Sequence, residues 1–167
     1  MCNLGFKKIT ADNWREKDEI NSYFKTIYEN GKSADIDMNK KVDAILEPKL
    51  NEKVPLEVKQ LFEVARGAII YGYFFYPLYA LGMEQLFRVR ESAVHFKCSE
   101  IGEIGKNFHR NIDILNAYNI IEDKELWHSI REIRNEFSHA NMQEIIPLNV
   151  AIQEINSCVK DINSLFI

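Results

Sequence analysis

The uncharged run GAIIYGYFFYPLYALGM, residues 67 to 83, limits the folds open to this chain more than any other stretch. It lies between Arg66 and Glu84 and approaches the length of a membrane-spanning helix. Pro77 and the several tyrosines argue against a span, because proline breaks a helix and each tyrosine would carry a hydroxyl into hydrocarbon. The run therefore predicts a hairpin of two helices buried in a protein core, with a break between Gly72 and Pro77.

Apolar residues recur with a helical period along almost the whole chain, and no run shows sustained alternation of apolar and polar residues. This pattern predicts an all-α protein. We expect a long antiparallel helix pair between residues 55 and 97, a third helix after the SEIGEIG connection, and a closing amphipathic helix after Pro147. The fourth helix is expected to turn one apolar stripe towards the core: Leu126, Ile130, Ile133 and Phe137.

The N-terminal residues predict an accessory helical layer. DNWREKDEINSYFKTIYENG, residues 12 to 31, has aromatic and apolar residues at helical spacing and ends in Gly31, which suits a helix cap. MNKKVDAILEPK predicts a short helix that ends near Pro48. We therefore divide the chain into an N-terminal helical extension, residues 1–54, and a main helical domain, residues 55–167.

Charge and cysteine content narrow the classes of function. The formal net charge is -4 with a pI near 5.6, so a polyanion would have to meet a local basic patch. Cys2, Cys98 and Cys158 are far apart and show no metal-binding spacing, which predicts neither a disulfide framework nor a zinc site. With no signal-peptide pattern at the N-terminus, these features favour a cytoplasmic protein.

The segment REIRNEFSHA, residues 131 to 140, gathers arginines, an asparagine, a serine and a histidine in an otherwise apolar or acidic chain. Histidine exchanges protons near neutral pH, and arginine presents a charged fork that matches phosphate oxygens. RNA carries its own nucleophile, the 2′-hydroxyl. Such a group therefore suits metal-independent cleavage of RNA. The candidate residues are Arg131, Arg134, Asn135, Ser138 and His139.

Helical geometry keeps Arg134 and His139 apart within one chain. In an unbroken helix His139 would point about 140° away from Arg134. The two side chains meet only if the helix unwinds near Ser138 or if a second copy supplies one of them across a two-fold axis. Alternatively, the cluster is simply the solvated face of an amphipathic helix, with Glu132 and Glu136 pairing with the arginines.

RNEFSH, Arg134 to His139, resembles the signature of the HEPN (higher eukaryotes and prokaryotes nucleotide-binding) superfamily: an arginine, a polar residue, three residues and a histidine. The preceding LWHSIREI lies on the helix that leads into that motif. FEVARGAIIYGYFFYPLYALGMEQLFRVRESAVHFK resembles the first long helical pair of these domains. The resemblance covers about residues 55 to 167 and leaves the N-terminal residues unexplained.

The resemblance implies an up-and-down helical bundle of HEPN type that forms a homodimer through the motif region. Many members are metal-independent endoribonucleases of toxin–antitoxin or antiviral defence systems, which implies RNA as substrate and an antitoxin or other defence-system protein as partner. Arg134 and His139 would then be the catalytic pair and Asn135 the residue that positions them, with Ser138 and Arg131 as neighbours. A tyrosine that some members carry is replaced here by Asn141, so its modification is not expected. Other members are non-catalytic modules that bind a nucleotide, nucleic acid or a partner protein, and this alternative stays open.

The remaining polar residues carry no predicted role. His95, His109 and His128 are scattered along the sequence without a second ligand at suitable spacing, so we expect no metal site and no cofactor. Glu84 and Glu91 lie on the second long helix, where they would face either the basic motif or solvent.

Overall fold

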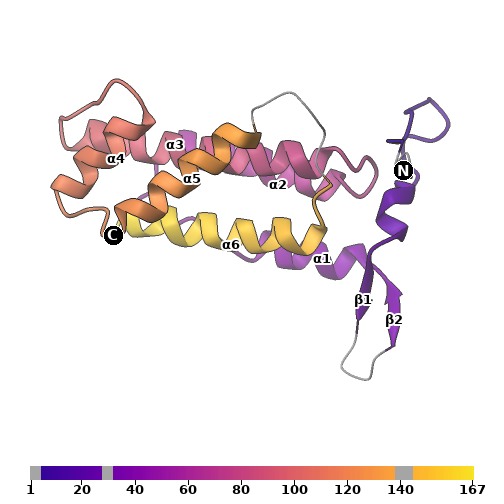
Figure 1. The fold of residues 1–167 in the computed structure, drawn as a ribbon. Helices are drawn as coiled ribbons and strands as arrows, with labels where there is room; N and C mark the ends of the chain where they lie inside the picture. The colour runs from indigo at the N-terminus through magenta and orange to yellow at the C-terminus, as the bar shows by residue number, and fades with distance from the viewer. Residues whose placement is uncertain (1–4, 28–31, 138–144) are drawn as a thin grey trace.

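The computed structural model describes residues 5–27, 32–137 and 145–167. In this part of the chain six α-helices pack as a bundle, and α3 (Leu78–Glu100) contacts most of the others (Figure 1). The prediction of an all-α bundle is confirmed, with a two-stranded hairpin as its only addition among the described residues. The other helices are α1 (Met38–Leu46), α2 (Leu56–Tyr71), α4 (Phe108–Ala117), α5 (Lys124–Phe137) and α6 (Leu148–Leu165).

The apolar run forms the α2–α3 hairpin, and the break falls where the sequence predicts it. α2 ends at Tyr71, and α3 begins after Pro77. The two helices approach closely at Gly82, where an added Cβ would lie 2.5 Å from a side-chain carbon of Ile69. No helix in the described ranges is long and apolar enough to cross a membrane. The interpretation of this run as a core hairpin is therefore supported.

The helix expected over residues 12 to 31 is not formed. Turns lead into a 3₁₀ helix, η1 (Glu19–Ser22), and then into β1 (Lys25–Ile27), which pairs antiparallel with β2 (Ser33–Asp35). Gly31, the expected cap, lies outside the described residues.

Buried polar side chains explain this difference. The Asp18 carboxylate accepts hydrogen bonds from the backbone N–H groups of Ile20, at 3.0 Å, and Tyr76, at 2.8 Å. The Asn21 amide donates to the Gly72 and Tyr73 carbonyls, at 3.2 and 3.1 Å. Asp and Asn side chains that bond to backbone compete with helix formation. Here they tie the N-terminal segment to the α2–α3 turn instead.

The short helix α1 and the closing helix α6 lie where they are expected. α1 ends two residues before Pro48, and α6 buries an apolar stripe that includes Leu148, Ile155 and Ile162. The third helix begins later than its apolar pattern suggests. Asn107 caps α4 through a side-chain bond to the Arg110 N–H, and Ile104 in front of it is exposed.

A buried ion-pair network joins α3 to α6. Arg90 is only 1% exposed and pairs with Glu154 and with Asp161, the latter at 2.9 Å from its Nε. Burial disfavours its charge, but the surrounding acidic groups, including Cys158 and both carboxyls, outweigh that and raise the pKa of its guanidinium. This network fixes one face of α3 against the C-terminal helix.

Candidate functional site

The last turn of α5 carries the described part of the predicted motif, Arg134 to Phe137, and the packing of α5 decides which of its side chains face the bundle. Trp127 and Ile130 are buried, and the Phe137 ring lies 5.5 Å from that of Phe87 on α3, centroid to centroid. Arg134 falls on the same side, four residues after Ile130.

The stripe predicted for this helix is partly wrong. Leu126 and Ile133 are 48% and 43% exposed, because α5 packs against α3 and α4 through the side that holds Trp127 and Ile130. Leu126 and Ile133 each lie one residue, about 100° around the helix axis, from a residue on that side. Two apolar side chains therefore remain on the surface of the motif helix.

Arg134 is held between two oxygen acceptors. Its Nη2 donates to Oε2 of Glu91 on α3 at 3.1 Å, and its Nη1 donates to Oδ1 of Asn135 at 3.2 Å. The side chains of Arg134 and Glu91 are each 36% exposed, so the pair stays in contact with solvent. Of the two alternatives for Glu91, facing the basic motif or facing solvent, the first is confirmed.

The other motif residues have different surroundings. Arg131 donates to the Glu132 carboxylate at 3.2 Å, a surface pair of the kind expected for the polar side of this helix. Ser138 and His139 lie outside the described residues, so whether His139 approaches Arg134 stays a prediction.

A cationic cleft begins beside Glu91. It has a volume of about 420 Å³ and lies between α3 and the start of α4. Arg88, His95 and Lys106 line it and are exposed, and Glu91, which pairs with Arg134, also lines it. The N-terminal end of α4 also points its partial positive charge to this region. Despite the acidic total, this edge of the molecule is therefore suited to an anion.

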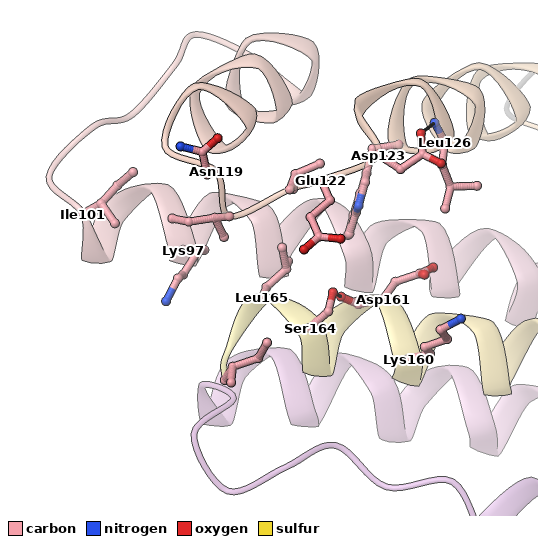
Figure 2. Close-up of a pocket in the computed structure, with 14 residues that line it drawn as sticks. Lys97, Ile101, Asn119, Glu122, Asp123, Leu126, Lys160, Asp161, Ser164 and Leu165 are labelled. Carbon is pink, nitrogen blue, oxygen red and sulfur yellow. Dashed lines mark hydrogen bonds between the residues drawn. The ribbon is translucent and has the colours of Figure 1, made fainter.

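A cavity larger than the cationic cleft lies away from the motif. It measures about 600 Å³ and is formed by the C-terminal ends of α3 and α6 and by the α4–α5 connection (Figure 2). Its charged lining is mixed: Lys97 and Lys160 face Glu122, Asp123 and Asp161. On α5 it reaches only the first turn, about two helical turns before Arg134. Because of this distance, the cavity has no part in the motif chemistry despite its size.

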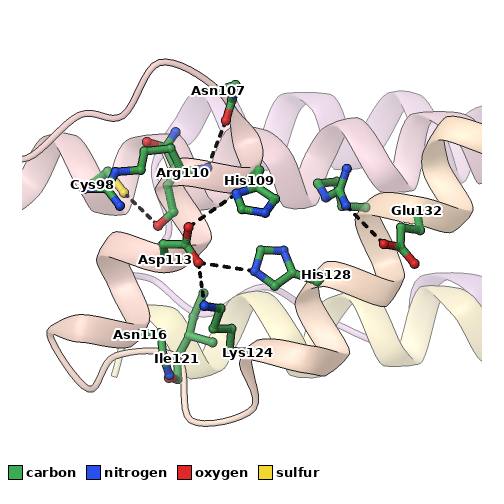
Figure 3. A network of polar contacts seen from close by, with 12 residues as sticks. Cys98, Asn107, His109, Arg110, Asp113, Asn116, Ile121, Lys124, His128 and Glu132 are labelled. Carbon is green, nitrogen blue, oxygen red and sulfur yellow. Dashed lines mark hydrogen bonds and ion pairs between the residues drawn. The ribbon is translucent and has the colours of Figure 1, made fainter.

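The sequence prediction that the histidines are scattered is wrong for two of the three. His109 of α4 and His128 of α5 lie with ring centroids 4.4 Å apart, and both contact Asp113 (Figure 3). The spacing of His109 and Asp113, one helical turn, was a readable signal. The approach of His128 was not, because it depends on how α4 packs against α5. His95 stays separate in the cationic cleft.

Comparison of the chain with protein-family models, with curated proteins and with solved structures finds no match.

Proposed function

We propose that this chain is a HEPN-type domain that cleaves RNA without a metal ion, as a homodimer in a toxin–antitoxin or antiviral defence system. The observation that carries the proposal is the position of Arg134: its guanidinium is oriented by Glu91 and Asn135 on a solvent-accessible edge, next to the cationic cleft. The motif resemblance implies that Asn135 positions the catalytic pair, and the hydrogen bond from Arg134 to Asn135 supports this role.

The chemistry needs few groups. The RNA 2′-oxygen forms a bond to phosphorus and gives its proton to the His139 imidazole, while the P–O5′ bond breaks and the departing 5′-oxygen takes up a proton from water. The products are a 2′,3′-cyclic phosphate and a 5′-hydroxyl. Arg134 stabilises the charge on the crowded phosphorane, as an arginine fork matches phosphate oxygens. Proton transfer by histidine contributes about 10²- to 10⁴-fold in rate.

The dimer would bring a second motif to the same cleft. Leu126 and Ile133 leave apolar surface exposed on α5 itself, and we assign this surface to the contact between two copies. A two-fold arrangement would double the number of motif arginines and histidines in one place. That local charge offsets the acidic total of the chain.

Cleavage of single-stranded RNA in EDTA tests the proposal. Arg134→Ala and His139→Ala should each lower the cleavage rate at least about a hundredfold, because each removes a group that acts in the transition state. Arg15→Ala is the matched control, since Arg15 is an exposed arginine on the N-terminal segment, and it should cleave as the wild type does. Equal cleavage by all four proteins would contradict the proposal.

One observation favours a second candidate, a non-catalytic HEPN module that binds a nucleotide, nucleic acid or a partner protein. The Glu91 carboxylate occupies one edge of the Arg134 guanidinium and competes with a phosphate for it. Tight RNA binding that depends on Arg134 but brings no turnover would select this candidate.

A further inference from the structure

A cluster of two histidines and an aspartate joins α4 to α5, away from the motif residues. His109 and Asp113 lie one turn apart on α4, and His128 faces them from α5 (Figure 3). One nitrogen or oxygen of each of the three lies within 4.8 Å of the others. Tertiary packing thus gathers residue types that bind transition metals.

The two histidine–aspartate distances in the cluster are long for hydrogen bonds and close to the separation of two ligands around one metal ion. His109 Nδ1 lies 3.3 Å from Asp113 Oδ2, and His128 Nε2 lies 3.3 Å from Asp113 Oδ1. Both exceed the range of about 2.7–3.2 Å for N–H···O hydrogen bonds. Two ligands of one tetrahedral ion with bonds of about 2.0–2.1 Å lie about 3.3 Å apart. The cluster is therefore close to the spacing that a shared ion needs.

The two ring nitrogens of His128 have different surroundings. His128 Nδ1 is buried and has no hydrogen-bond partner among the described residues. Its remaining ring nitrogen, Nε2, is the one that faces Asp113. His109 is 53% exposed, so an ion can enter from solvent and this ring can adjust by rotation.

Lys124 is a cation that would compete with a metal ion for the Asp113 carboxylate. Its Nζ lies 2.8 Å from Asp113 Oδ1, and its side chain is 40% exposed at the first residue of α5. The ammonium of Lys124 therefore contacts the same carboxylate that the two histidines face. An exposed lysine chain can swing into water, and its departure would leave the carboxylate open to another cation.

We propose that His109, Asp113 and His128 bind one zinc-class divalent cation, which displaces Lys124 and clamps α4 to α5. Imidazole and carboxylate are the donors that zinc accepts, and three protein ligands leave the fourth position to water. Because Lys124 neutralises Asp113 when no ion is bound, the fold itself does not need the metal. The clamp holds α5, the helix that carries Arg131 and Arg134. It replaces our expectation that the chain has no metal site.

Calorimetric titration of the full-length, EDTA-treated and dialysed protein with Zn²⁺ tests this proposal. Wild type should bind one ion per chain, and His128→Gln and Asp113→Asn should each weaken binding about tenfold or more. The matched control is His95→Gln, a histidine on the surface of α3 outside the cluster, which should bind as the wild type does. Equal Zn²⁺ binding by wild type, both ligand variants and the control would overturn the proposal. Absence of Zn²⁺ binding by both wild type and the Lys124→Gln variant, described next, would also overturn it.

Lys124→Gln keeps the test decisive even if a ligand variant fails to fold. Removing the competing ammonium should strengthen Zn²⁺ binding about tenfold, and Zn²⁺ should then raise the melting temperature more than in the wild type, because an ion that binds only the folded state stabilises it. Weaker binding by Lys124→Gln would refute the displacement. The Zn²⁺ titrations contain no RNA, so their outcome does not depend on the proposed function. A chain that binds Zn²⁺ but does not cleave RNA would contradict only the proposed ribonuclease function.

Discussion

Arg90 and Glu91 are neighbours on α3, but they meet their partners in opposite surroundings. Arg90 turns inward and is held by Glu154 and Asp161 of α6 with 1% of its surface exposed. Glu91 turns towards α5 and pairs with Arg134, and each of these side chains is 36% exposed. Pairing between arginine and carboxylate therefore serves two purposes on α3. The buried network fixes helix positions, and the half-exposed pair leaves a guanidinium within reach of a ligand.

The largest effect we expect comes from opening the buried network. Arg90→Ala should lower the free energy of unfolding by roughly 3–5 kcal/mol, because it leaves the Glu154 and Asp161 carboxylates in low-dielectric surroundings without their partner. Urea unfolding measures the change. Arg90→Met combined with Asp161→Asn should recover much of the loss, since the unpaired charge at residue 161 is then removed. A loss below about 1 kcal/mol for Arg90→Ala would show that the network is open to water.

A smaller effect is expected at the half-exposed pair. A double-mutant cycle of Glu91→Ala and Arg134→Ala should give a coupling energy of about 0.2–1 kcal/mol, the range of solvent-exposed ion pairs. The same urea titrations supply all four free energies. A coupling energy as large as the loss at Arg90 would remove the contrast between the two faces of α3 and would make Arg134 a structural residue.

The smallest effect concerns the two buried cysteines. Burial raises the pKa of the Cys158 thiol to about 12 and that of the Cys98 thiol to about 11, and both are free thiols in the core. Because these pKa values are raised, burial of the neutral thiols stabilises the fold below the ordinary thiol pKa. This contribution is lost only as the pH rises towards 11 and 12.

Thiol titration with Ellman's reagent between pH 7 and 9 measures this effect. In a Cys2→Ser background, which removes the third cysteine, the folded protein should react slowly at every pH in this range, and the urea-unfolded protein should react at once. Fast reaction of the folded protein would show that the interior next to Arg90 opens readily.

The α2–α3 hairpin and the N-terminal segment show where sequence patterns succeed and fail. Pro77 and the apolar run predicted the hairpin because both act locally: proline breaks a helix in its interior but is tolerated at its start, where Pro77 lies in α3. Residues 12 to 31 have the spacing of a helix, but Asp18 and Asn21 bond to the turn after α2. That competition between local and distant partners is invisible in a sequence window. The same limit applies to Leu126 and Ile133, whose exposure depends on which neighbours α5 meets.

The sequence by itself determined the helical class, the break before Pro77, the closing helix and the presence of arginine and asparagine on one late helix, because these follow from period and backbone chemistry. Only the tertiary structure decided that Glu91 meets Arg134, that Arg90 is buried among carboxylates, and that His128 reaches His109 and Asp113. Each of these contacts joins residues of different helices. Their distances are set by how the helices cross, which no local pattern records.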